Sequence, residues 1–127
     1  MRMMLMVAAG GALGSVARYL VAGQATALTG GAFPWGTLAV NVLGCAAMGA
    51  LVELAALAWS PGPELRALLM VGLLGAFASF SIFALDVEFL VGRGAPMAGI
   101  AYIAASLIGS LGGFLGARQL VRAILAG

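Results

Sequence analysis

The sequence has little charge, no histidine, no lysine and a single cysteine. Of its 127 residues 8% are charged and 64% are hydrophobic, and the mean hydropathy is +1.17. Soluble domains carry about 25% charged residues, so this composition excludes a protein that dissolves in water by itself. The net charge of +2 is also too small for the basic surface that nucleic-acid backbones require. We expect a protein that is embedded in a lipid bilayer and binds no nucleic acid.

The scarcity of metal ligands and thiols excludes further classes of function. Cys45 has no partner for an internal disulfide, and without histidine the chain lacks the usual ligands of a soft-metal site. Redox and zinc chemistry are therefore excluded, and we do not expect an enzyme. Arg2 and the apolar residues after it resemble a signal peptide, but no clear cleavage site precedes Arg18, so we interpret this segment as a membrane helix.

The spacing of the charged residues predicts four transmembrane helices. Uncharged runs of 15, 34, 19 and 24 residues follow Arg2, Arg18, Arg66 and Arg93. A membrane-spanning helix needs about 20 residues, and a cluster of turn-forming residues at 23–34 divides the longest run in two. We therefore predict an all-α membrane protein with one domain, residues 1–127. Its helices are expected at about 3–23, 35–58, 64–91 and 97–120, with neighbouring helices antiparallel because the links are short.

The third predicted helix is too long to cross a membrane straight. Residues 64–91 would extend about 42 Å as a helix, whereas the hydrocarbon core is about 30 Å thick. The segment from Gly72 to Phe83 combines glycines with serines and phenylalanines, and we expect the helix to break there, near the middle of the membrane. Such a break frees backbone carbonyls, which can hold a small cation such as Na⁺.

Pairs of glycines four residues apart predict close helix packing. In lipid, helices associate where small residues let their backbones approach. The pairs Gly10 and Gly14, Gly109 and Gly113, and Gly112 and Gly116 have this spacing. They predict a compact bundle and an oligomer, because four helices alone enclose little space.

Neutral polar residues form stripes on three of the predicted helices. Such residues are costly in hydrocarbon unless they face protein or water. They comprise Thr37 and Asn41 on the second helix, Ser79 and Ser81 on the third, and Tyr102, Ser106 and Ser110 on the fourth. A lining of neutral hydrogen-bond donors without a carboxylate suits a small anion, although each residue could instead bond only within the bundle.

Arg18 is the only cation placed well inside a predicted helix. It either extends to the membrane surface as an anchor or attracts anions at the mouth of an aqueous vestibule. Glu53, Asp86 and Glu88 lie near helix ends and are interpreted mainly as interfacial. No carboxylate lies within the first predicted helix, which argues against a proton-coupled cation exporter.

Three motifs in this order resemble the bacterial fluoride channels of the Fluc or CrcB type. They are GGALGSVARY (Gly10 to Tyr19), GTLAVNVLG (Gly36 to Gly44) and GAFASFSIF (Gly75 to Phe83), with Glu88 and the polar stripe of the last helix following. The resemblance covers essentially the whole chain. It implies a passive fluoride exporter of the cell inner membrane, built as an antiparallel, dual-topology homodimer whose third helix is broken near the midplane.

The resemblance also implies roles for individual residues. Asn41 would lie in the pore, and Phe80 and Phe83 would line the fluoride path with their ring edges. Thr37, Ser81, Tyr102, Ser106 and Ser110 would lie along or beside the pore, and Arg18 near its vestibule. Backbone carbonyls of Gly75 and Ala78 would hold a structural Na⁺ at the dimer centre, although Ala78 replaces a threonine that is usual in the family.

Charge distribution leaves the topology open. Four arginines are expected at the end of the bundle that carries the termini, and only Arg93 at the other. This bias favours cytoplasmic termini, whereas dual topology favours little bias, so a heterodimer with an oppositely oriented subunit is an alternative. A small multidrug or guanidinium exporter and a non-conducting membrane subunit are alternatives in function.

Overall fold

The structure, a computed structural model, describes residues 1–127 as helices joined by short turns. The first, second and fourth crossings are α1 (Arg2–Thr29), α2 (Trp35–Leu57) and α6 (Pro96–Ala126). The third crossing is made of α3 (Pro63–Arg66), the π-helical stretch η1 (Ala67–Leu74), α4 (Gly75–Phe77) and α5 (Phe80–Gly92). All four crossings are long and apolar enough to span a membrane. This confirms the expected all-α architecture with four candidate transmembrane segments.

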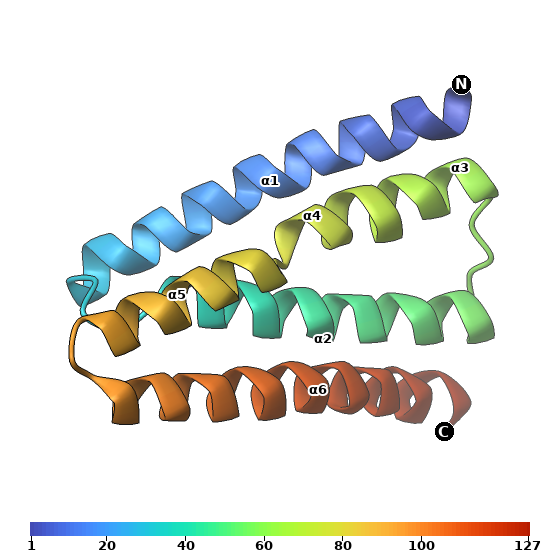
Figure 1. The fold of residues 1–127 in the computed structure, drawn as a ribbon. Coiled ribbons are helices and arrows are strands. Elements are labelled where there is room, and N and C mark those ends of the chain that lie inside the picture. The colour runs from blue at the N-terminus through green and yellow to red at the C-terminus, as the bar shows by residue number, and fades with distance from the viewer.

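Successive crossings run antiparallel, so both termini lie at one end of the molecule (Figure 1). The link between α2 and α3 lies at the same end, and the turns from α1 to α2 and from α5 to α6 lie at the opposite end. α2 packs mainly on α6, and α1 packs mainly on η1 and α4, while α1 and α6 make no contact. The helices therefore form an open arrangement in which only 14 of 127 residues are buried.

Two helices extend beyond their predicted ends. α1 continues to Thr29 because the hydroxyls of Thr26 and Thr29 donate to the carbonyls of Ala22 and Ala25 one turn earlier, at 3.0 and 2.7 Å. Their polarity is thus satisfied inside the helix, which ends only at Gly30, where φ is +85°. α6 continues to Ala126, past two arginines whose partner lies on α2.

Close backbone packing occurs where the first glycine pair predicts it. A Cβ atom on Gly10 would lie 2.2 Å from the carbonyl oxygen of Leu68, and one on Gly14 would lie 2.2 Å from that of Leu73. Both glycines are buried. Their missing side chains therefore let α1 rest directly on the backbone of η1.

The glycines of α6 divide into two groups. A Cβ atom on Gly109 or Gly113 would meet Val42 of α2 at 3.0 or 3.3 Å, whereas one on Gly112 or Gly116 would meet nothing within 4 Å. The packing prediction is confirmed for the first pair and is wrong for the second within this chain. Within one chain, close packing is confined to neighbouring helix pairs, and few residues are buried.

The adjacent glycines of α1 provide a matched test of this packing. Gly10→Ala should destabilise the protein by about 1–3 kcal/mol, the usual cost of overpacking, because its methyl group overlaps the backbone of η1. Gly11→Ala adds the same methyl group where nothing lies within 4 Å, and should leave stability unchanged or slightly higher. Thermal unfolding of both variants in detergent micelles checks this, and equal melting temperatures would contradict it.

Candidate functional site

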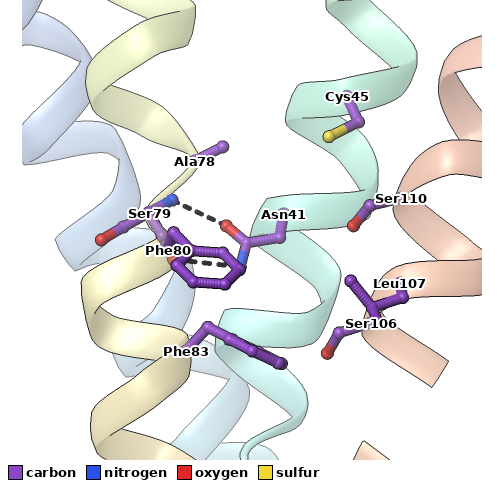
Figure 2. A pocket seen from close by; sticks show the side chains of 9 residues that line it. All are labelled: Asn41, Cys45, Ala78, Ser79, Phe80, Phe83, Ser106, Leu107 and Ser110. Atoms are coloured by element: carbon purple, nitrogen blue, oxygen red, sulfur yellow. Dashed lines mark hydrogen bonds between the residues drawn. The ribbon is translucent and has the colours of Figure 1, made fainter. Parts of the chain in front are cut away.

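The third crossing is interrupted at Ala78 and Ser79, within the segment where the sequence predicts a break. Both residues are extended, with φ and ψ of −83° and 144° at Ala78 and −144° and 120° at Ser79. The amide side chain of Asn41 on α2 compensates for the lost helical bonds (Figure 2). Its Oδ1 accepts from the backbone N–H of Ser79 at 2.8 Å, and its Nδ2 donates to the carbonyl of Ser79 at 3.2 Å.

Ser79 also starts the helix again after the interruption. Its hydroxyl oxygen accepts from the backbone N–H of Ile82 at 3.2 Å and lies 3.1 Å from the hydroxyl of Ser81, so Ser79 caps α5 in the usual way of a serine. The predicted pathway residue Ser81 is thus exposed and paired with this cap rather than facing the cavity described next.

A pocket of about 220 Å³ lies beside the interruption (Figure 2). Its walls come from α2, the interruption, α5 and α6. It is lined by Asn41, Cys45, Ala78, Ser79, Phe80, Phe83, Ser106, Leu107 and Ser110. The structure therefore brings together five of the eight residues predicted for the ion pathway, and it adds Cys45, Ser79 and Leu107.

One hydroxyl in this pocket has no partner. Ser106 is only 4% exposed, and its Oγ is the one buried side-chain polar atom without a hydrogen bond. Leaving such a group unpaired costs about 1–3 kcal/mol, and buried polar groups are normally satisfied. This hydroxyl lies beside that of Tyr102 and has no accessible surface of its own, so it would need a small side-chain movement to donate to a ligand in the pocket.

The two phenylalanines of the predicted pathway differ in their surroundings. Their rings lie 5.1 Å apart between centroids with an interplanar angle of 37°. Phe83 is 8% exposed and packs on Tyr102, whereas Phe80 is 75% exposed. Within one chain, Phe83 closes the base of the pocket and Phe80 projects outward from α5.

Tyr102 has a charged partner that the sequence interpretation missed. Tyr102 is fully buried, and its hydroxyl donates to a carboxylate oxygen of Asp86 at 3.0 Å. A carboxylate therefore approaches the polar stripe of α6, which the sequence interpretation did not expect. Asp86 follows Phe83 by three residues on α5, and this helical spacing was the available signal.

Arg18 and Thr37 lie together in a second, larger pocket. This pocket of about 640 Å³ lies between α1 and α2 and also includes Gln24 and Thr26. Arg18 is half-buried, and no carboxylate lies within ion-pair distance of it, since the three ion pairs of the chain involve other arginines. Thr37 also lines a smaller pocket of about 150 Å³ with Asp86, so it lies between Arg18 and the Tyr102–Asp86 pair.

Glu53 is a second carboxylate whose partners the sequence interpretation missed. It is 1% exposed, and its two oxygens accept from the Nε atoms of Arg118 at 2.7 Å and Arg122 at 2.6 Å. A carboxylate near the C-terminal end of α2 is disfavoured by the helix dipole, and the two arginines of α6 compensate for it. Their spacing of four residues was the signal in the sequence. The Glu88 side chain, by contrast, is exposed as expected.

An interrupted membrane helix beside a pocket lined by neutral donors defines a class of protein, the multi-pass membrane proteins built around an ion or small-molecule site. The family model described as CrcB-like protein, Camphor Resistance (CrcB), matches residues 5–117. The chain belongs to this family.

Curated relatives match over nearly their full length. A protein of Rhodospirillum centenum named fluoride-specific ion channel FluC is 53% identical over 126 residues, which cover 99% of this chain and 100% of that protein. Proteins of the same name from Rhizobium etli and a Chelativorans species are each 48% identical. They cover 95% and 96% of this chain, and the matches span 97% and 98% of their own lengths.

The contact between Asn41 and the interruption can be tested by Asn41→Asp. The carboxylate can still accept from the N–H of Ser79, but it cannot donate to the Ser79 carbonyl and repels it. We expect a loss of about 1–3 kcal/mol in stability, measured by thermal unfolding in micelles. Cys45→Ser, one turn further along α2 in the same pocket, is the control. Equal melting temperatures for the two variants would show that the bonds to Ser79 contribute nothing.

Proposed function

We propose that this protein is a channel that lets fluoride leave the cytoplasm passively, down its electrochemical gradient, and so lowers fluoride toxicity. The observation that carries the proposal is the pocket beside the interruption, which gathers the neutral polar side chains of Asn41, Ser106 and Ser110. It occurs in a chain whose relatives are named fluoride-specific ion channels. Export requires no energy source beyond the gradient.

The pocket offers what a strongly hydrated anion needs, which is several donors without a fixed cation that would trap it. Ser106 and Ser110 present hydroxyls from successive turns of α6. Asn41 uses one N–H on Ser79, and its amide has a second N–H to donate. Phe80 and Phe83 complete the lining, and the edges of aromatic rings carry partial positive charge that can face an anion.

Arg18, Thr37 and Tyr102 extend this proposed path toward one end of the bundle. Arg18 attracts anions into the larger pocket, and Thr37 stands between that pocket and Tyr102. The only O–H of Tyr102 donates to the carboxylate of Asp86, so Tyr102 would line the path without donating to the anion. Ser81 is assigned to the outer edge of the path, beside the exposed ring of Phe80.

The proposal includes an antiparallel homodimer with dual topology. A single chain buries few residues and leaves Phe80 75% exposed, so a second copy would complete the path on that side. The arginines at the terminal end are partly neutralised, because Glu64 pairs with Arg2 and Glu53 pairs with Arg118 and Arg122. A heterodimer with an oppositely oriented subunit is the alternative arrangement.

We place a structural Na⁺ at the centre of this dimer. No backbone N–H pairs with the carbonyls of Gly75 or Ala78, because the helical donors that would reach them are lost at the interruption. Unpaired carbonyl oxygens are ligands that suit a hard cation. The bound ion would supply positive charge that offsets the cost of an anion deep in the membrane. Ala78 contributes no hydroxyl, so its backbone oxygen alone would act.

The cell inner membrane is the proposed location, since export from the cytoplasm requires it. A small multidrug or guanidinium exporter has the same size, but such an exporter would need a carboxylate within α1, where this chain has none. A non-conducting subunit would not need an unpaired buried hydroxyl. Neither alternative is favoured by the family of the chain.

Fluoride efflux from liposomes, recorded with a fluoride electrode, tests the function. Vesicles with the purified protein should release fluoride much faster than empty vesicles. Ser106→Ala should slow release by about tenfold or more, because a hydrogen bond to a charged group contributes about 1.5–3 kcal/mol. Phe83→Ile should slow release as well, because it removes the partly positive ring edge. Ser60→Ala, the same change in the exposed link after α2, is the control.

Two outcomes would overturn separate parts of this proposal. Release no faster than from empty vesicles, with the folded protein present, would exclude the channel. Fast release that is equal in Ser106→Ala and Ser60→Ala would place the path elsewhere in the molecule.

Cysteine labelling tests dual topology. In a Cys45→Ser background, Ser60→Cys and Ala95→Cys place single thiols at opposite ends of the bundle. With an impermeant maleimide on intact cells, about half of each variant should be labelled if both orientations occur. Complete labelling of one variant and none of the other would show a single orientation.

A further inference from the structure

The Glu53 cluster, defined as Glu53, Arg118 and Arg122, is not part of the proposed ion path. It lies at the end of α2 and α6 that carries the chain termini. Each arginine bonds Glu53 through its Nε atom only, and no hydrogen bond engages the terminal nitrogens of either guanidinium group. Two arginines against one carboxylate leave one positive charge in excess. The cluster therefore has unused donors and charge for an anion.

A pocket lies directly against these unused groups. It measures about 110 Å³ and is lined by Leu115, Arg118, Gln119 and Arg122, all of α6. Both arginines reach it from a partly exposed position, since their side chains are 41% and 57% exposed, whereas Glu53 is 2% exposed. The pocket thus presents guanidinium and amide donors, with the carboxylate held behind them.

The face of α6 that carries this pocket changes from apolar to basic along the helix. Leu111, Leu115, Arg118 and Arg122 recur at helical spacing on one stripe of α6. Leu111 and Leu115 are exposed and lie closer to the middle of the membrane-spanning helix than the arginines. The stripe therefore offers an apolar surface followed by a basic pocket at the helix end. A free anion in water would use only the basic part of this stripe.

We propose that this pocket binds the phosphate group of an anionic phospholipid, whose acyl chain lies along Leu115 and Leu111. Forked guanidinium groups match phosphate oxygens in geometry and charge. Basic pockets at the ends of membrane helices are a known form of headgroup site. Glu53 holds both arginines through their Nε atoms, which leaves their terminal nitrogens free to bond a phosphate in the pocket that both side chains line.

Native mass spectrometry of the full-length protein, released from bilayers that mix phosphatidylglycerol with phosphatidylcholine, tests this site. The protein should retain phosphatidylglycerol in preference to phosphatidylcholine. Arg122→Gln should reduce retention about fivefold, the effect of one arginine near an anionic headgroup. Gln119→Leu should reduce it as well. This variant leaves the bonds to Glu53 intact, so the test holds even if Arg122→Gln fails to fold.

Arg66→Gln is the matched control, because it removes an exposed arginine at the same end of the molecule that has no ion pair. It should retain phosphatidylglycerol like the unchanged protein. Equal loss in Arg66→Gln and Arg122→Gln would overturn the site in favour of general surface charge. Displacement of the lipid by inorganic phosphate would show a site for free anions.

A second copy of the chain is the remaining occupant to exclude. In the proposed antiparallel dimer, the end of one copy that carries Gln119 meets the end of the other that carries Ala95. In a Cys45→Ser background, the double variant Gln119→Cys with Ala95→Cys should therefore stay monomeric on non-reducing gels after mild oxidation in the bilayer. A disulfide between two copies would show that the pocket is covered by protein and would overturn the proposal.

Discussion

Two hydrogen bonds between the side chain of Asn41 and the backbone of Ser79 hold the interrupted crossing in place. In hydrocarbon, an unpaired backbone group costs several kcal/mol, so an interruption survives only where a neighbouring helix supplies partners. An amide carries its acceptor and its donors on separate atoms, so Asn41 can bond the N–H and the carbonyl of the same residue at once. The pocket and the restart of α5 depend on this contact, because both are formed by the residues that it fixes.

The sequence predicts the large features because charge and length decide them. The uncharged runs leave room for four crossings, with the longest run divided between the first two. Length alone did not decide the interruption, because α6 is as long as the third crossing and continuous; the glycines, serines and phenylalanines between Gly72 and Phe83 indicated it. The helix ends were less predictable, since Thr26 and Thr29 satisfy their hydroxyls within α1 rather than in a turn. Gly112 and Gly116 have the spacing of a packing motif, but they face away from the chain's other helices.

The candidate site, too, was only partly predictable. Helical spacing predicts which residues share a helix face, but not which side chains bond to one another. Helical spacing placed Ser106 and Ser110 on one face, and both line the pocket. It could not show that Asn41 is engaged with Ser79, or that Asp86 and Glu53 have partners on α6, because those contacts join segments far apart in the chain. Proximity to a helix end suggested an interface for both carboxylates, whereas their burial depends on which helix packs beside them.

The open arrangement of the helices has a consequence for assembly. Most large apolar side chains face outward, so lipid tails and a second subunit compete for the same surfaces. When two subunits associate, each exchanges contacts with lipid tails for contacts with the other subunit. The fraction of associated subunits then follows mass action in the two dimensions of the membrane. The assembled fraction of such a protein depends on its surface density in the bilayer, which makes dilution within the membrane equivalent to a change in subunit affinity.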